Sequence, residues 1–311
     1  MKTETIFEIK ALYRDNFRVQ GFSFGEGEQA VCIVGSMRGN ENQQLYACSQ
    51  LIRALRELEE RGQLVEGRRI LVVPCVNPYS MNVKKRFWSI DNTDINRMFP
   101  GYALGETTQR IAAGVFEQIR GYRFGIQFAS FYMPGSFVPH IRMMATGYEN
   151  VSLAAQFGLP YIVLHQPRPF DTTTLNYNWQ IWETNAFSIY TTNTARIDRY
   201  SAQEAVHAIL HFLSEQGIIC GRKYYGHISR IVKSEDFLSL RAERAGFFQP
   251  FVRPGEQVIE GQRLAVISDP LLGEPLSTIT APADGVAAFV QDEPMCYQHT
   301  AVIKLIGEEQ P

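Results

Sequence analysis

Short apolar runs alternate with longer amphipathic segments over the first two thirds of the chain, and this alternation restricts the fold more than any other feature. Ala30–Gly35 has the composition of a buried strand, and Gln43–Glu60 repeats leucines at helical spacing. A strand, a glycine-containing loop and a helix in this order are typical of α/β proteins, in which the loops after the strands build the functional site. Further strands or helices are predicted at Ile70–Val76, Thr107–Ile119, Phe124–Ala129, Val151–Phe157, Tyr161–Leu164, Ala186–Thr192 and Ile197–Leu213.

The sequence pattern changes after Gly217. From about residue 223 onwards, short β-type runs are separated by Pro-Gly and Asp-Gly turn sequences. Strands spaced in this way predict a small barrel or sandwich. We therefore expect two domains, an α/β domain at residues 1–221 and a β-rich domain at residues 222–311.

Composition excludes several classes of partner. The formal charge of -2 gives no electrostatic reason to expect nucleic acid or an acidic membrane surface. No apolar run approaches the roughly 20 residues that a membrane span needs, and the charged N-terminus has no apolar signal core. The 5 cysteines are odd in number and scattered, without a C-x-x-C pair. We expect a reduced, cytoplasmic protein with no nucleic-acid or membrane partner.

The stretch Asn77–Gly101 is dense in groups that bind anions and carbonyls. A guanidinium grips a carboxylate through two parallel hydrogen bonds, and a neighbouring amide can hold the rest of a ligand. A basic surface loop would have the same composition, and the residue types alone do not separate the two interpretations. The groups are Lys84, Lys85, Arg86, Asn92, Asp94, Asn96 and Arg97.

Within this stretch, Asn77-Pro78, Arg86 and Asp94–Gly101 (DINRMFPG) resemble the pattern of the succinylglutamate desuccinylase/aspartoacylase family, a branch of the zinc carboxypeptidase superfamily. The family pattern is a strand, NP, an arginine and then DLNRxFPG, and the segment between arginine and aspartate is longer here. The resemblance implies an α/β fold with a zinc-carboxypeptidase-like mixed sheet flanked by helices. It also implies a small C-terminal all-β domain, a barrel-sandwich hybrid of the biotinyl/lipoyl type without the carrier lysine.

The resemblance implies a hydrolase that deacylates N-acyl amino acids or similar small carboxylates. It assigns substrate binding to Arg86, Asn96, Arg97 and Arg142, the last in a stretch that matches the family's PHxR. The aromatic, amide-rich segment Pro167–Trp182 is expected to wall the pocket, although a packed surface loop would have the same composition. The second domain is expected to shape the pocket mouth or an oligomer contact.

The residues at the family's metal site differ from its pattern. Arg38 and Glu41 occupy the places of the two ligands in GxxHGxE, so that Glu41 is the only surviving metal position. Gln127 stands at the third ligand, the histidine of DLHxxS, and Tyr190 at the glutamate that activates the zinc-bound water. Arg38 has no lone pair for a metal, and Gln127 offers only an amide, whereas zinc sites use thiolate, imidazole and carboxylate. Tyr190 has a phenol, which with its ordinary pKa near about 10 is a poor base at neutral pH. Zinc is thus the cofactor implied by resemblance, with two of its ligands replaced.

Three functional hypotheses remain. The first is a zinc amidohydrolase, and the second is a non-hydrolytic carboxylate-binding protein or regulatory pseudo-enzyme on the same scaffold. In the second, Arg38 supplies a fixed positive charge to a carboxylate ligand, or it pairs with Glu41 and fills the place of the metal. The third is a different reaction in which Arg38, Glu41 and Tyr190 act as electrostatic and acid–base groups.

Overall fold

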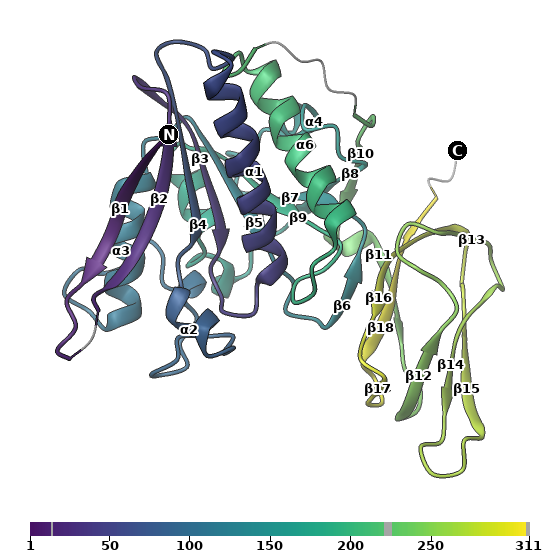
Figure 1. The fold of residues 1–311 in the computed structure, drawn as a ribbon. Coiled ribbons are helices and arrows are strands. Elements are labelled where there is room, and N and C mark those ends of the chain that lie inside the picture. Colours follow the sequence, from purple (N-terminus) through teal and green to yellow (C-terminus); the bar gives the residue numbers. More distant parts are fainter. Residues whose placement is uncertain (14, 221–225, 309–311) are drawn as a thin grey trace. The chain divides into compact units, whose positions relative to one another are not determined.

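The computed structural model describes residues 1–13, 15–220 and 226–308 (Figure 1). The chain divides into two compact units. The α/β unit comprises Met1–Ser130 and Pro139–Ile231, and the β unit comprises Phe131–Val138 and Val232–Pro311. The predicted boundary between residues 221 and 222 lies outside the described residues, and the units divide later, after Ile231. The sequence pattern does not indicate that residues 131–138 belong to the β unit, because only long-range strand pairing places them there.

A nine-stranded mixed sheet with the order β1-β2-β4-β3-β5-β9-β7-β8-β10 forms the centre of the α/β unit. β3, β4, β5 and β9 run parallel, whereas β7 lies antiparallel to β9 and β8 is parallel to β7. At the N-terminus, β1 and β2 form an antiparallel pair. The strands are β1 (Lys2–Ile9), β2 (Phe17–Phe24), β3 (Glu28–Ser36), β4 (Arg68–Cys75), β5 (Phe124–Ala129), β7 (His140–Met144), β8 (Tyr161–His165), β9 (Asn185–Tyr190) and β10 (Arg230–Lys233).

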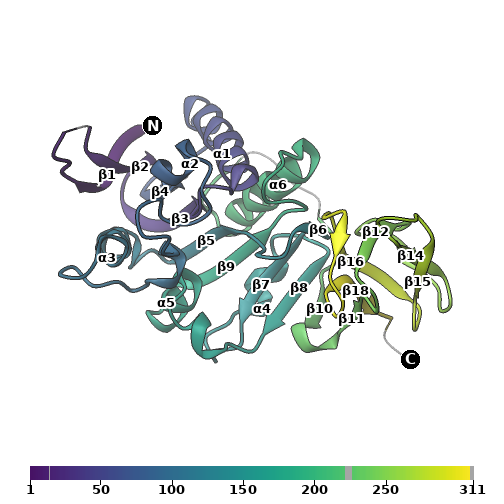
Figure 2. The same ribbon diagram turned by 90° about the horizontal axis from the view of Figure 1, so that it is seen from below.

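Helices cover both faces of this sheet. α1 (Asn42–Glu60) and α6 (Arg199–Glu215) lie side by side on one face, and α3 (Thr107–Ile119) and α5 (Leu175–Ile181) lie on the other (Figure 2). The shorter helices are α2 (Pro78–Asn82), α4 (Val151–Ala155), η1 (Ile95–Arg97) and η2 (Pro169–Asp171). No helix in the described part of the chain combines the length and the apolar content that crossing a bilayer requires.

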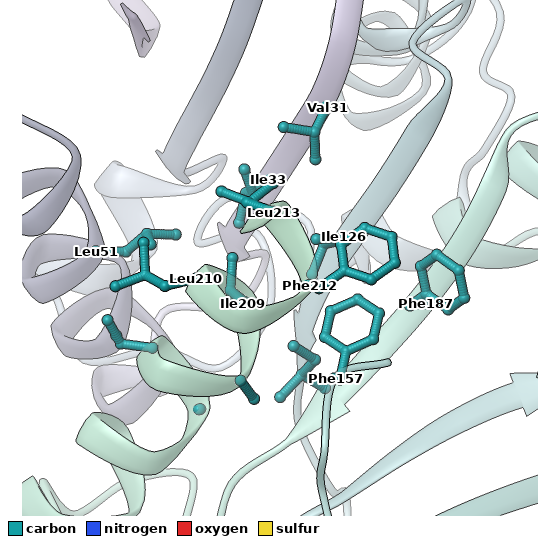
Figure 3. Packing of buried hydrophobic residues seen from close by; sticks show 14 of the residues in the cluster. Val31, Ile33, Leu51, Ile126, Phe157, Phe187, Ile209, Leu210, Phe212 and Leu213 are labelled. Carbon is teal, nitrogen blue, oxygen red and sulfur yellow. The ribbon is translucent and has the colours of Figure 1, made fainter. Parts of the chain in front are cut away.

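The face under α1 and α6 is a continuous apolar core (Figure 3). Ile126 and Phe187 project from the sheet toward Leu51 of α1 and Phe212 of α6, and all four are fully buried. The ring of Phe157 stacks on that of Phe212, with centroids 4.1 Å apart. Burial of each such side chain contributes about 1.5–3 kcal/mol, so this face holds the helices on the sheet.

α6 begins at Arg199, two residues inside the helical segment predicted at Ile197–Leu213. The carboxylate of Asp198 accepts hydrogen bonds from the backbone N–H groups of Tyr200 (3.0 Å) and Ser201 (3.1 Å). These are two of the N–H groups that a helix leaves unsatisfied in its first turn, so Asp198 is the capping residue.

The opposite face of the sheet is mixed in character. Gly125 lies under the indole of Trp179 from α5, and a Cβ at this glycine would come within 2.7 Å of the ring. Successive strand residues point to opposite faces, so Ile126 faces α6 and Gln127 returns to the α5 face. Gln127 of β5 pairs in register with Ser188 of β9, and Ser188 pairs in turn with Arg142 of β7. A row of polar side chains therefore crosses the sheet beneath α5.

The β unit consists of two antiparallel sheets, as the predicted all-β domain requires. One is five-stranded, with the order β11-β18-β16-β13 and β6 paired to β16; the other is four-stranded, with the order β15-β14-β12-β17. Its core includes Leu264, Ile267, Val302, Ile303 and Leu305. Its elements are β6 (Gly135–Phe137), η3 (Ser234–Asp236), β11 (Phe237–Arg241), β12 (Gly246–Pro250), β13 (Gln257–Val258), β14 (Arg263–Ser268), β15 (Pro275–Thr280), β16 (Gly285–Gln291), β17 (Met295–Cys296) and β18 (Ala301–Gly307).

Candidate functional site

The loop between β3 and α1 is folded tightly around Glu41. One carboxylate oxygen, Oε2, accepts hydrogen bonds from the backbone N–H groups of Met37 (2.7 Å) and Arg38 (3.1 Å). At Gly39 a Cβ would lie 2.2 Å from the carbonyl oxygen of Lys85, so only glycine fits where the loop touches this backbone. The loop thus holds the side chains of Arg38 and Glu41 in one place.

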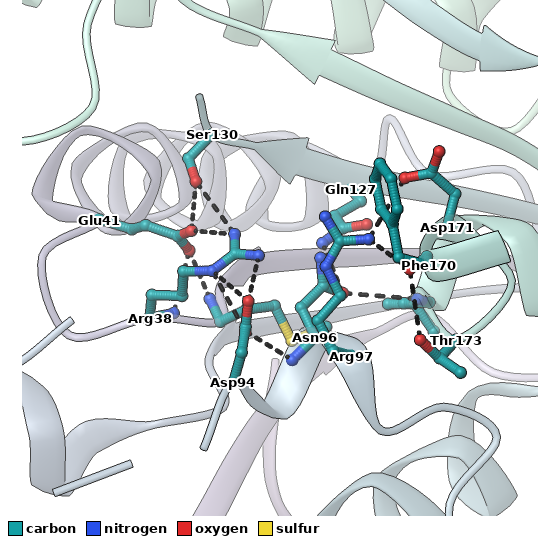
Figure 4. A network of polar contacts seen from close by, with 12 residues as sticks. Arg38, Glu41, Asp94, Asn96, Arg97, Gln127, Ser130, Phe170, Asp171 and Thr173 are labelled. Carbon is teal, nitrogen blue, oxygen red and sulfur yellow. Dashed lines mark hydrogen bonds and ion pairs between the residues drawn. The ribbon is translucent and has the colours of Figure 1, made fainter. Parts of the chain in front are cut away.

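The guanidinium of Arg38 lies between two carboxylates (Figure 4). Its Nη1 is 2.9 Å from Oε1 of Glu41, and its Nη2 is 2.8 Å from Oδ2 of Asp94. Nη1 also donates to Oγ of Ser130 (3.2 Å), and the Ser130 hydroxyl donates to Glu41. We call these four residues the Arg38 cluster. The structure therefore shows Arg38 paired with Glu41, one of the two roles expected for it, and adds Asp94 as a partner that the sequence did not indicate.

Arg38 is permanently charged in this position. Burial by itself would lower the pKa of Arg38, but the carboxylates of Glu41 and Asp94 raise it above its ordinary value. Arg86 lies near the same charges: burial, and then the positive charge of Arg38, lower its pKa. The carbonyl of Arg86 also accepts a hydrogen bond from the N–H of Gly39 (3.0 Å). Arg86 is thus beside the Arg38 cluster.

The residues of the Arg38 cluster do not fit a zinc ion. Both oxygens of Glu41 already accept hydrogen bonds, and Arg38 offers no lone pair. Within the described residues, no group of three or more His, Cys, Asp or Glu side chains is placed to hold a metal. The guanidinium donates to Oε1 of Glu41, the one carboxylate of the expected metal site that this chain retains.

Gln127 and Asn96 lie next to the cluster and contact each other. Nε2 of Gln127 is 3.5 Å from Oδ1 of Asn96, which also accepts from the N–H of Leu175 at 3.4 Å. Both bonds are long and therefore weak. Asp94 caps η1 by accepting a hydrogen bond from the N–H of Asn96 (3.0 Å). The side chain of Asn96 in turn contacts Leu175, the first residue of α5. The side-chain amide of Gln127 thus contacts the amide of Asn96, which is neither an acidic nor an imidazole group.

Arg97 is tied to η2, inside the segment predicted to be a pocket wall. Its Nη1 donates to the carbonyl of Phe170 (2.6 Å) and to Oδ1 of Asp171 (3.2 Å), and its guanidinium lies 5.2 Å from the Phe170 ring centroid. Asp171 also accepts from His165 (3.0 Å) and from the N–H of Arg168 (3.0 Å). Burial alone would raise the pKa of Asp171, but the hydrogen bonds from His165, Arg168 and Arg97 hold it well below its usual range. The segment is thus a hydrogen-bonded element made of η2 and α5 and is not an open loop.

Tyr190 is the last residue of β9, at the carboxyl end of this central strand. Its ring stacks on the imidazole of His140, with centroids 4.8 Å apart and planes 5° from parallel, and both side chains are buried. Its register partner in β5 is Ala129, the residue before Ser130. Tyr190 therefore lies at the same end of the sheet as Ser130 of the Arg38 cluster.

Arg142 is separated from the Arg38 cluster by one strand. Its partner in β9 is Ser188, and Ser188 pairs in turn with Gln127 of β5. The structure thus brings together Arg38, Glu41, Gln127, Asn96 and Tyr190 and sets Arg97 and Arg142 at the periphery. Sequence reasoning missed Asp94 as a charge partner of Arg38, because a contact between segments so far apart does not follow from local spacing.

A model of the succinylglutamate desuccinylase/aspartoacylase catalytic domain matches residues 28–215. None of the curated proteins matches the chain. Among solved structures, a succinylglutamate desuccinylase/aspartoacylase from Rhodobacter sphaeroides is 20% identical, over 95% of this chain and 91% of its own, with a TM-score of 0.77. A succinylglutamate desuccinylase from Silicibacter sp. TM1040 is 19% identical, over 97% and 93% of the two chains, with a TM-score of 0.79.

The product-bound ectoine utilization protein EutE (DoeB) from Ruegeria pomeroyi is 18% identical, over 93% of this chain and 89% of its own, with a TM-score of 0.75. At these identities the structural matches establish the shared fold. The match to the catalytic-domain model extends over more than half of the sequence. The chain therefore belongs to the succinylglutamate desuccinylase/aspartoacylase family.

Proposed function

We propose that this protein binds a small carboxylate of the N-acyl amino acid class without hydrolysing it by the zinc-dependent route of its family. Family membership supports the ligand class. The single observation on which the loss of hydrolysis rests is the buried guanidinium of Arg38, held between Glu41 and Asp94 at 2.9 and 2.8 Å.

Zinc would have to displace this guanidinium from Glu41. Removing one partner from a buried ion pair is unfavourable by about 3–5 kcal/mol, because the remaining charge is left without a partner. A zinc ion beside Glu41 would also stand against the charge of Arg38. The guanidinium of Arg38 thus takes the place of the zinc ion that the family binds next to this glutamate.

A carboxylate ligand still has donors at the edge of the cluster. Arg97 uses only Nη1 for its two hydrogen bonds to Phe170 and Asp171, and its side chain is 34% exposed. Within the described residues its other guanidinium nitrogens make no hydrogen bond, so they are free to bind a carboxylate. Loss of a charged hydrogen-bonding partner weakens binding by roughly tenfold or more.

Titration calorimetry and a deacylation assay, both with N-acetyl-L-aspartate and N-succinyl-L-glutamate, test the proposal. We expect binding without release of the acyl group, and an affinity that falls at least about tenfold in Arg97→Ala. Arg56→Ala is the matched control, because Arg56 is an exposed arginine on α1 with only a 3.8 Å contact to Glu60. Steady release of acetate or succinate by the wild type would instead establish the hydrolase of the first hypothesis.

A further inference from the structure

β15 is a sheet edge of the β unit that lacks the usual protection of edge strands. It ends the four-stranded sheet, with β14 as its neighbour (Figure 1). Proteins normally protect such edges with charged side chains or by keeping the strand short. β15 has the uncharged sequence PLSTIT, and its proline is the first residue. In the part of the chain that the structure describes, the other edge strands carry charges, as β1, β10 and β11 do, or are two or three residues long.

The backbone of Thr278 and Thr280 points away from β14. The N–H of Ala281, the residue after β15, donates to the carbonyl of Gln262 (2.9 Å), and its own carbonyl accepts a hydrogen bond from the same segment. Ala281 therefore faces β14. Because this direction alternates along an antiparallel strand, Ile279 faces β14 as well. The N–H and C=O groups of Thr278 and Thr280 thus lie at the free edge of the sheet.

Two leucines project from the turn that precedes β15. Leu271 is 90% exposed and Leu272 is 75% exposed. The carboxylate of Asp269 accepts hydrogen bonds from the N–H groups of both, at 2.7 and 2.9 Å. A turn held in this way presents the two leucines in a fixed position, so they form an apolar contact surface at the start of β15.

A second exposed apolar side chain lies beside the other end of β15. Ile259 is 67% exposed, and the next residue, Glu260, donates its N–H to the carboxylate of Asp284 (2.6 Å), just after the end of the strand. Six residues of β-strand span roughly 20 Å, so the leucines and Ile259 cannot cover each other within one chain. In an antiparallel pair of two copies, the start of each β15 lies beside the end of the other. The leucines of each copy would then approach Ile259 of the other.

We propose that two copies of this chain pair through β15, antiparallel, about a two-fold axis at Ile279. Thr278 of each copy then lies opposite Thr280 of the other, and the outward N–H and C=O groups of both residues form hydrogen bonds. Threonine pairs across strands are favourable, and a two-fold contact closes without leaving a free edge. A second copy fits better than an unrelated extended peptide, because it alone brings an apolar surface to each end. The pairing goes beyond the proposed function, since it uses no residue of the α/β unit.

Sedimentation velocity of the full-length protein at a series of concentrations tests the pairing. We expect the wild type to form a dimer. The double variants Thr278→Lys/Thr280→Lys and Thr278→Lys/Thr280→Glu are a matched pair, because they differ only in the sign of one charge. The first places like charges opposite each other between the copies, and the second places opposite charges there. We therefore expect the Lys/Glu variant to dimerise at least about tenfold more tightly than the Lys/Lys variant, with a smaller difference at high salt.

Thr278→Pro tests whether the outward N–H takes part in the pairing. Proline is compatible with a sheet edge where the N–H faces solvent, but here it removes a hydrogen bond between the copies and should leave a monomer. Ser239→Pro is the matched control on β11, another edge strand. The N–H of Ala242 donates to the carbonyl of Thr300 (2.9 Å), so by alternation Ser239, three residues earlier, also faces away from its sheet. Ser239→Pro should remain a dimer.

Three results would overturn the proposal. One is a wild type that stays monomeric at every concentration, which would leave β15 to a strand of another protein or to solvent. Another is a dimer that persists in Thr278→Pro or is lost equally in Ser239→Pro. The third is a Lys/Glu variant that associates no more tightly than the Lys/Lys variant. A dimer that meets all these expectations but does not bind N-acyl amino acids would keep the pairing and reject the proposed function.

Discussion

Replacing Arg38 by methionine is the perturbation that bears most directly on the Arg38 cluster. Methionine keeps much of the side chain's volume and removes the charge. Glu41 and Asp94, with side chains 2% and 16% exposed, would then lie close together without a shared cation. Removing one partner of a buried pair destabilises by about 3–5 kcal/mol, which we expect for Arg38→Met. The free energy of unfolding of a domain is about 5–15 kcal/mol, so at least about a fifth of it is lost.

Urea denaturation followed by tryptophan fluorescence measures this loss of stability in the α/β unit. All 3 tryptophans lie in the α/β unit, at Trp88, Trp179 and Trp182, so the signal does not report unfolding of the β unit. Arg56→Met is the control, since an exposed pair on a helix contributes only about 0.3–0.5 kcal/mol. Adding Glu41→Gln to Arg38→Met should recover part of the stability, because it removes one of the two unpaired charges. A loss below about 1 kcal/mol in Arg38→Met would refute a buried cluster of this strength.

Three further predictions concern other groups. The double variant Arg38→His/Gln127→His, which adds two imidazoles beside Glu41, should bind about one zinc per chain by elemental mass spectrometry; a metal-free double variant would show that these positions do not converge. The lowered pKa of Asp171 means that it stabilises the fold above the ordinary carboxyl pKa near about 3.9, and that this contribution disappears as the pH falls toward the folded-state pKa. The difference in urea midpoint between wild type and Asp171→Asn should therefore be larger at pH 7 than at about pH 3, and equal differences would contradict the assignment. Desolvation raises the pKa of the half-buried Cys75 to about 11, so only the exposed Cys220 should react rapidly with a disulfide reagent at neutral pH, and rapid modification of Cys75 would contradict its raised pKa.

The layers of the α/β unit could be predicted because periodicity is a local property. The run Ala30–Gly35 lies within β3, Gln43–Glu60 lies within α1, and the segment Ile197–Leu213 overlaps α6. Each of these depends on residues a few positions apart. The family pattern extended the prediction to the strand ends, where Arg38, Gln127 and Tyr190 stand.

Contacts between distant segments could not be predicted in the same way. Asp94 meets Arg38 across 56 positions, and residues 131–138 join the β unit through the pairing of β6 with β16. Asn176 and Gln180 lie in a segment whose aromatic and amide composition suited either a pocket wall or a packed surface loop. The packing of α5 on β9 and β5 joins distant segments, so only the assembled sheet reveals it.

The zinc content of the purified protein tests the central claim most directly. The protein would be incubated with zinc, freed of excess metal and measured by elemental mass spectrometry. Because the guanidinium of Arg38 occupies the place beside Glu41, we predict well below one zinc per chain, with no difference between wild type and Glu41→Ala. About one tightly bound zinc per chain, lost in Glu41→Ala, would show that a substitute ligand set exists and would contradict the account.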